Sequence, residues 1–183
     1  MSLFLLISCD GLPDTALVAS DEDIVALRIE PAELVAYTSP GEPFEVQFTA
    51  WAERPDGSEV AFELVQWSSS NESAGGIDSE GYFASVDTNG GVTEISARSL
   101  THEMSARVQI IYTEDIVPEG IDEGLAEAFN AVESFNGGGP EILYPGDGVR
   151  VPRNLEGLAF TWADAQGHDA YRVRFRSDIT DIS

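Results

Sequence analysis

Residues 92–112 read VTEISARSLTHEMSARVQIIY, and apolar and polar side chains alternate through both ends of this stretch. Such alternation is typical of a β-strand with one buried and one solvated face. We therefore expect two strands, at 92–98 and 104–112, with Ile95, Val108 and Ile110 directed into a core. The fold then depends on what these two strands pack against.

Upstream of this stretch, short runs of the same kind recur, and turn signals separate them. Pro31 ends the first run, and Pro55-Asp56-Gly57 predicts a turn, since proline fixes φ and glycine accepts a positive φ. The earlier runs are 24–30, 34–37, 44–51 and 60–67, and residues 77–83 predict a strand end, a tight turn and the start of a new strand. About seven short strands, with turns roughly every 8–12 residues and no helix, indicate an all-β fold of immunoglobulin-like type. We expect two packed antiparallel sheets over residues 23–113.

Large apolar side chains on one face of these runs should fill the core. The inward-facing residues predicted for the run 44–51 are Phe44, Val46 and Phe48. Trp67 would add a large apolar surface to a core that has no disulfide. The parity of the alternation changes after Leu64, and a β-bulge between Leu64 and Val65 would return Trp67 to the core.

Several pieces of this region, taken in order, resemble a bacterial immunoglobulin-like domain of group 2, the BIG2 type. The pieces are Leu27-Arg28-Ile29-Glu30-Pro31, Asp56-Gly57, Val65-Gln66-Trp67-Ser68-Ser69-Ser70-Asn71, Ile77-Asp78-Ser79-Glu80-Gly81-Tyr82-Phe83 and Gly91-Val92-Thr93-Glu94-Ile95-Ser96-Ala97. The resemblance covers about half of the chain. It implies a β-sandwich of the kind found in intimin- and invasin-like adhesins and in many other surface proteins.

After residue 113 the pattern changes. Residues 114–139 form an acidic linker, in which 118–136 place apolar residues at helical spacing and predict one amphipathic connecting helix. The residues of this apolar stripe are Leu125, Phe129, Val132 and Phe135. Residues 140–183 alternate again and loosely resemble the opening strands of a fibronectin type III module. Because a whole sandwich needs about 100 residues, we expect a partial second β domain there and a longer chain beyond it.

The only cysteine, Cys9, follows a short apolar run and one serine, and Leu6-Ile7-Ser8-Cys9 resembles a bacterial lipobox. The resemblance implies that residues 1–9 are a lipoprotein signal and that Cys9 carries the lipid. A secretory signal begins with a basic segment, whereas Met1-Ser2 is uncharged, so we expect this signal to be truncated. Residues 10–22 are polar and acidic and predict a tether.

These features predict that the protein is localised at the bacterial cell envelope. The membrane is the expected partner, through the lipid anchor on Cys9, and we expect the outer membrane or cell surface, or an extracellular site, rather than the periplasm. No stretch reaches the roughly 18 apolar residues that a membrane-spanning helix needs.

The charge balance excludes one class of partner. The formal net charge is −24, and all nine basic residues are arginine. A surface of this kind repels phosphate backbones, because binding to them needs lysine or arginine to displace counterions. We therefore expect no nucleic acid partner.

No residue pattern indicates a catalytic centre, a resident metal or a cofactor. His102, His168 and one cysteine do not supply a His/Cys zinc set. Asp87-Thr88-Asn89-Gly90 begins like a calcium loop, but its glycine comes too early and the closing glutamate is absent. Calcium at 87–89 or at 78–80 is therefore an alternative, not the favoured interpretation.

A second candidate surface comes from three arginines near the end of the chain. Arg172, Arg174 and Arg176 alternate with Tyr171, Val173 and Phe175, which predicts a cationic stripe on one strand face. Either the arginines pair with neighbouring acids, or the stripe binds a polysaccharide or a carboxylate.

Together these observations predict a non-enzymatic surface protein whose immunoglobulin-like module acts as a spacer or as an adhesion and presentation domain. A surface protein or a polysaccharide would be its partner. Two alternatives stay open: the N-terminal anchor and spacer of a secreted hydrolase, and a calcium-dependent carbohydrate-binding module.

Overall fold

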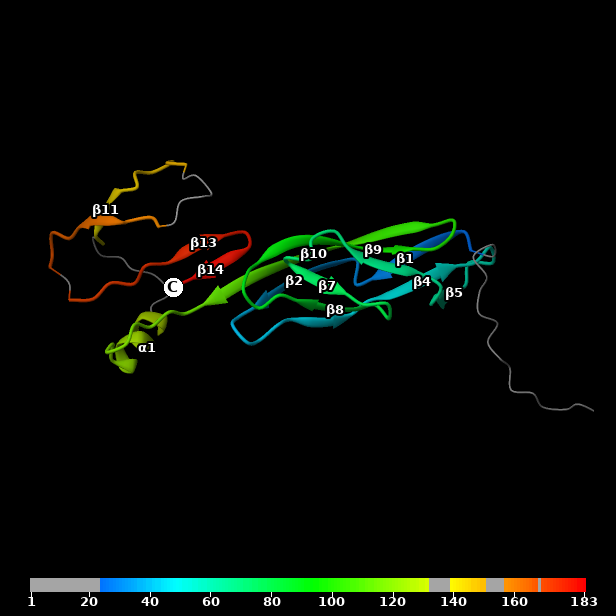
Figure 1. Ribbon diagram of the computed structural model, residues 1–183, viewed down its shortest axis with the longest axis horizontal. Helices are drawn as coiled ribbons and strands as arrows, with labels where there is room; N and C mark the ends of the chain where they lie inside the picture. The colour runs from blue at the N-terminus through cyan, green and yellow to red at the C-terminus, as the bar shows by residue number, and fades with distance from the viewer. Residues whose placement is uncertain (1–23, 132–138, 151–156, 168) are drawn as a thin grey trace, which may run out of the picture. The chain divides into compact units, whose positions relative to one another are not determined.

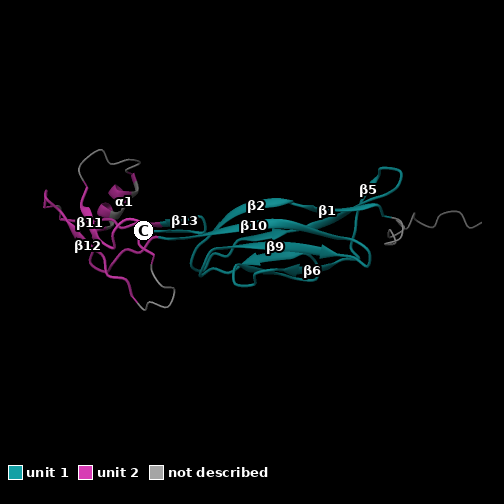
Figure 2. Cartoon of the chain, turned by 90° about the horizontal axis from the view of Figure 1, so that it is seen from above, with its two compact units in different colours: residues 1–114, 176–182 teal, residues 115–175, 183 magenta. Residues whose placement is uncertain are grey.

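The computed structural model describes residues 24–131, 139–150, 157–167 and 169–183 (Figure 1). Cysteine Cys9, the lipoprotein signal and the tether lie outside these residues, as does His168. The chain divides into two compact units (Figure 2). The first unit runs to Glu114 and also includes Arg176–Ile182, and the second comprises Asp115–Phe175 and Ser183.

The described residues are mostly β-strand, with one short helix, so the all-β class is confirmed. The strands up to residue 114 are β1 (Ala26–Glu30), β2 (Glu33–Thr38), β3 (Glu45–Gln47), β4 (Thr49–Glu53), β5 (Glu59–Ala61), β6 (Gln66–Ser69), β7 (Gly75–Ile77), β8 (Tyr82–Ser85), β9 (Gly91–Arg98) and β10 (Glu103–Glu114). Later elements are α1 (Glu123–Ala131), β11 (Glu141–Tyr144), β12 (Thr161–Ala163), β13 (Phe175–Ser177) and β14 (Thr180–Ile182).

The largest sheet of the first unit is built around β10. On one side β10 pairs antiparallel with β9, and β9 pairs with β6. On the other side it pairs parallel with β2, and at its end it pairs parallel with β14. The prediction of two purely antiparallel sheets is therefore wrong, because alternation fixes which face a residue takes but not the direction of the neighbouring strand.

Two smaller antiparallel sheets complete the first unit. One has the strand order β1-β4-β5 and the other β3-β8-β7. Proline Pro31 follows β1, as the sequence predicts, and β2 begins two residues later in the large sheet. The turn between β4 and β5 uses Gly57 at φ +80°, and Asp56 accepts hydrogen bonds from the backbone and hydroxyl of Ser58.

One main core joins the three sheets. Phe48, Phe83, Ile95, Val108 and Ile110 are fully buried in it. The inward positions predicted for Phe48, Ile95, Val108 and Ile110 are thus confirmed. The other three predicted core residues, Phe44, Val46 and Trp67, are half-buried and pack against the same cluster.

The parity change after Leu64 has a different cause from the predicted one. Residues 62–65 belong to no strand, and they carry the chain from β5 in one sheet to β6 in another. Phe62 is buried in a smaller core with Leu27 and Ala52, whereas Trp67 packs on the main core. The predicted bulge between Leu64 and Val65 is therefore wrong, because a crossover between sheets resets which side faces inward.

The second unit contains α1 and the antiparallel pair β11–β12. The predicted helix over 118–136 is observed at 123–131, while Val132 and Phe135 lie outside the described residues. Among the residues of this unit whose burial the structure describes, none is buried. Residues 171–174 are not in a strand, so the alternating strand predicted for 171–176 is wrong except at its end, where β13 begins.

Candidate functional site

The turn at 78–80, one of the two candidate calcium loops, is held by its own first carboxylate. Asp78 Oδ1 accepts hydrogen bonds from the backbone N–H groups of Glu80 and Tyr82, both at 2.9 Å. Gly81 follows at φ +84°, and a Cβ on this residue would lie 2.7 Å from the carbonyl oxygen of Phe48. The turn therefore needs both its aspartate and its glycine for backbone geometry.

The polar side chains of the second candidate calcium loop, at 87–89, hydrogen-bond to the backbone of other segments. Asp87 Oδ2 accepts a hydrogen bond from the backbone of Gly41 at 3.0 Å. Asn89 Nδ2 donates to the carbonyl of Ser73 at 2.7 Å. No group of three or more His, Cys, Asp or Glu side chains that could hold a metal ion occurs in the part of the chain that the structure describes.

The Trp-Ser-Ser-Ser-Asn piece forms a hydroxyl network around Thr93 of β9. Thr93 Oγ1 lies 2.8 Å from Ser69 Oγ and accepts a hydrogen bond from the backbone of Asn71 at 3.1 Å. Ser69 Oγ donates to the carbonyl of Gly75 at 2.7 Å. Thr93 is only 1% exposed, so its hydroxyl needs these partners. Its alternation with Ile95 and Ala97 places it on the core face, a signal that the sequence carried.

A second buried hydroxyl lies at the end of β2. Thr38 is 2% exposed, and its Oγ1 lies 3.1 Å from the carbonyl oxygen of Glu42 and 3.2 Å from that of Val86. Ser85 Oγ lies 3.3 Å from Thr38 Oγ1 and accepts a hydrogen bond from the backbone N–H of Phe44 at 2.8 Å. These contacts fix the end of β2 to two other segments. Sequence reasoning missed Thr38, because two of its partners, Ser85 and Val86, are distant in the chain.

An open hollow of about 580 Å³ lies beside this network. Tyr37, Phe44, Glu42 and Glu45 are among its lining residues, and none of the lining residues is basic. Glu45 accepts a hydrogen bond from the hydroxyl of Tyr82, and this bond raises the pKa of Tyr82. The hollow would repel an anionic ligand, because Glu42 and Glu45 line it and no lining residue is basic.

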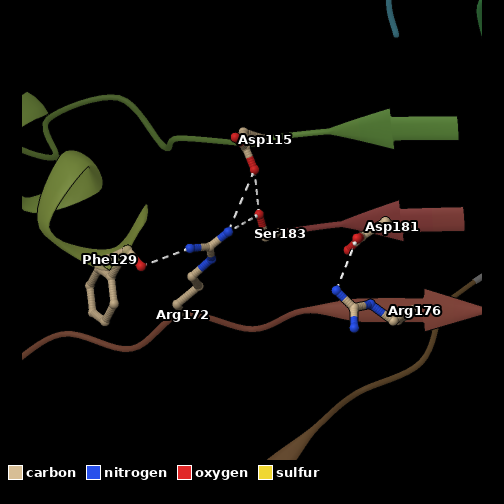
Figure 3. Close-up of polar contacts among 6 residues, drawn as sticks. All are labelled: Asp115, Phe129, Arg172, Arg176, Asp181 and Ser183. Carbon is tan, nitrogen blue, oxygen red and sulfur yellow. Dashed lines mark hydrogen bonds and ion pairs between the residues drawn. The ribbon is translucent and has the colours of Figure 1, made fainter. Parts of the chain in front are cut away.

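Two arginines of the predicted cationic stripe, Arg172 and Arg176, make contacts with neighbouring groups (Figure 3). Arg172 donates to the carbonyl of Phe129 at 3.0 Å and to Ser183 Oγ at 2.8 Å, and it lies 3.8 Å from Asp115 Oδ1. Ser183 Oγ also donates to Asp115.

Within the first unit, Arg176 pairs with Asp181 at 3.3 Å. Of the two interpretations, the one in which the arginines pair with neighbouring acids therefore describes Arg172 and Arg176.

Two further observations bear on identity. No family model matches this sequence, and no curated protein matches it. None of the helices that the structure describes is long and apolar enough to cross a membrane.

Proposed function

We propose that this protein is an envelope-anchored, non-enzymatic surface protein. In this proposal residues 23–113 form an immunoglobulin-like module of the BIG2 type, which spaces or presents other parts of the molecule. The observation that carries the proposal is that the candidate calcium ligands of that segment accept hydrogen bonds from the backbone. Asp78 accepts one from Glu80, and Asp87 accepts one from Gly41, so both carboxylates hold loops in place.

The packing of the first unit supports the same function. Phe48 and Phe83 meet edge to face in a core to which three sheets contribute, with ring centroids 6.3 Å apart. A spacer needs a stable body with a polar surface, and it needs no cleft. The net charge of −24 suits a solvated module outside the cell, since charge far from zero keeps proteins soluble and apart.

The anchor is the second part of the proposal. Lipid on Cys9 would tie the protein to the membrane, and residues 10–22 would separate the module from the lipid surface. We place the protein at the outer membrane or cell surface. A surface protein or a polysaccharide is the class of partner that such a module would present or contact.

Metabolic labelling with a fatty acid tests the anchor. The full chain, preceded by a complete secretory signal, is expressed in a bacterial host, and we expect it to incorporate label and to partition into detergent. Cys9→Ser should abolish both. Ser8→Ala is the matched control, because it keeps a small residue before the cysteine and should leave both unchanged. An unlabelled parent protein in the soluble periplasm would contradict the proposal.

A further inference from the structure

The hollow beside Thr38 lies wholly within the first unit and has the size of a ligand site. Its volume is about 580 Å³, and small-molecule sites occupy roughly 300–1,000 Å³. Its walls come from the end of β2, the segment between β2 and β3, the start of β3 and the end of β10. Tyr37 is one of the lining residues and is 64% exposed. Its aromatic ring therefore offers a surface on which a ligand can lie.

The backbone around this hollow is fixed by hydrogen bonds. Ser39 and Glu42 exchange backbone hydrogen bonds at 3.3 and 2.9 Å, and Asp87 Oδ2 accepts one from the N–H of Gly41 at 3.0 Å. Thr38 Oγ1 lies 3.1 Å from the carbonyl oxygen of Glu42. These contacts hold the walls in place before a ligand arrives. Binding to a preformed site costs less ordering than binding to a mobile one.

Two carboxylates line the hollow, and each is held by a hydroxyl group through one of its oxygens. Glu42 Oε2 accepts a hydrogen bond from Ser39 Oγ at 3.0 Å, and Glu45 Oε2 accepts one from the hydroxyl of Tyr82. Among the described residues, no arginine pairs with either carboxylate, whereas Arg28 pairs with two carboxylates elsewhere in the unit. The second oxygens of Glu42 and Glu45 are thus available to a ligand.

The lining selects the charge of that ligand. It contains no basic residue, so an anion would meet two carboxylates without a counter-charge. A bound calcium ion needs more ligands than two carboxylates supply, and the described ranges contain no group of three or more His, Cys, Asp or Glu that could hold a metal. An organic cation suits the hollow better. Its charge pairs with the carboxylates, and its body can lie on the Tyr37 ring.

Among organic cations, an arginine side chain matches this lining best. Its planar guanidinium has five N–H donors, enough for two carboxylates, and it stacks on aromatic faces. Its methylene stem would lie against apolar groups, which Pro43 and Phe44 provide. A lysine ammonium is a compact, strongly hydrated charge without this planar face. The lining therefore favours arginine over lysine.

The kind of partner that carries this arginine follows from charge. The chain has a formal net charge of −24, so a second copy is repelled and a basic protein is attracted. A neutral polysaccharide could stack on Tyr37, but it would leave both carboxylates of the hollow without a counter-charge. The hollow therefore favours a basic segment of another protein.

We propose that the hollow lined by Tyr37, Glu42, Phe44 and Glu45 is a docking site for an arginine side chain on a basic segment of a partner protein. The choice of a protein partner rests on the proposed function, in which the module presents or contacts a surface protein or a polysaccharide. The site itself belongs to the first unit and does not depend on the lipid.

Titration with a short peptide tests the site. The full chain carries Cys9→Ser, which prevents lipidation, and the probe is a capped peptide with one arginine between glycines. We expect saturable shifts of the backbone amide signals of Glu42 and Glu45 in two-dimensional nuclear magnetic resonance spectra. The same peptide with citrulline, which keeps the shape of arginine but carries no charge, should not produce these shifts.

Exchange of single carboxylates for amides separates the hollow from the general negative charge. Glu42→Gln and Glu45→Gln should each weaken binding of the arginine peptide about two- to fivefold, as expected for exposed ion pairs. Glu94→Gln is the matched control. It removes the same charge from an exposed position on β9 that does not line the hollow, and it should leave the affinity nearly unchanged.

The aromatic ring is tested in the same titration. Tyr37→Ala removes the ring and should weaken binding about two- to fivefold, the size of an exposed cation–π contact. Tyr37→Phe keeps the ring and should keep the affinity. An equal loss in both variants would mean that the ring face does not bind the guanidinium and would overturn this part of the site.

Three results would overturn the proposal as a whole. They are equal binding of the arginine and citrulline peptides, an equal loss in Glu94→Gln and Glu42→Gln, and saturable binding of maltohexaose at the hollow without a response to the arginine peptide. None of them depends on lipidation. A lipidated parent protein whose Cys9→Ser variant ignores the arginine peptide would contradict this inference alone, and an unlipidated parent whose Cys9→Ser variant binds it would contradict the proposed anchor alone.

Discussion

The two units of this chain carry similar sequence patterns but differ in what they bury. In the first unit, Phe48 and Ile95 are at most 1% exposed. In the second, Ile142 is 61% and Trp162 is 41% exposed, although both lie in strands. Alternation assigns a side chain to a face, and burial then requires another layer to cover that face. A pair of strands such as β11–β12 does not supply one.

Aromatic truncation in each unit should give the largest difference. Phe48→Ala removes a buried ring that contacts Phe83 and Trp67, and we expect a loss of about 3–5 kcal/mol in the free energy of unfolding. Phe160→Ala removes only a half-buried ring that meets Phe175 edge to face, so we expect about 0.5–1.5 kcal/mol. Chemical denaturation followed by circular dichroism measures both.

The result would break the comparison if the two losses were equal, because the second unit would then hold its rings as tightly as the first. Tyr37→Phe provides a control for handling and expression. Its ring is 64% exposed and lies outside both cores, so its effect should stay within about 0.5 kcal/mol.

The contrast also shows what the sequence could and could not predict. Local alternation located β9 and β10 and identified Phe48, Ile95, Val108 and Ile110 as core residues. The parallel pairing of β2 with β10 could not be read from it, because pairing joins residues about seventy positions apart. The change of parity after Leu64 predicts a bulge, whereas residues 62–65 cross between two sheets, because parity does not say which sheet comes next.

For the polar residues, too, the sequence predicts local interactions but not those between distant segments. The tight turn within 77–83 was predictable from the local sequence, since Asp78 and Gly81 both act within a few residues. Thr38 depends on Ser85 and Val86, which no local pattern connects to it. Arg172 depends on Asp115 and Ser183, which are equally remote in sequence.

Neighbouring glycines offer the next test of packing. Gly75 is buried, and a Cβ on it would lie 2.7 Å from the carbonyl oxygen of Ala84 and would also collide with the Phe83 ring. Gly75→Ala should therefore cost about 1–3 kcal/mol of unfolding free energy. Gly76 is exposed with nothing near its Cβ position, so Gly76→Ala should change stability by no more than about 0.5 kcal/mol.

Gly157 extends this test to the second unit. It also has open space around its Cβ position, and Gly157→Ala should be as neutral as Gly76→Ala. Thermal melts of the three variants rank them by their loss of stability, and we expect the lowest melting temperature for Gly75→Ala. A harmless Gly75→Ala would mean that Phe83 is free to move and that the core of the first unit is looser than its burial indicates.

The smallest expected effect is on the pH dependence of stability, through three tyrosines with raised pKa values. Measuring it also tests whether the two units unfold together. Hydrogen bonds to carboxylates raise the pKa of Tyr82, through Glu45, and of Tyr112, through Glu114. The same interaction with Asp164 raises the pKa of Tyr171 in the second unit. All three hydroxyls are hydrogen-bond donors only while they keep their protons.

The sign of the pH dependence follows from the direction of these shifts. Above the ordinary tyrosine pKa of 10.0, the unfolded chain loses protons that the folded chain still holds. Unfolding then releases protons, so stability should be unaffected below that pH and should fall as pH rises through the raised folded values. Tyr82→Phe and Tyr112→Phe should each flatten the alkaline decline of the melting temperature of the first unit. Tyr171→Phe should leave that decline unchanged if the first unit unfolds independently, and an equal flattening by all three variants would show that the two units unfold as one.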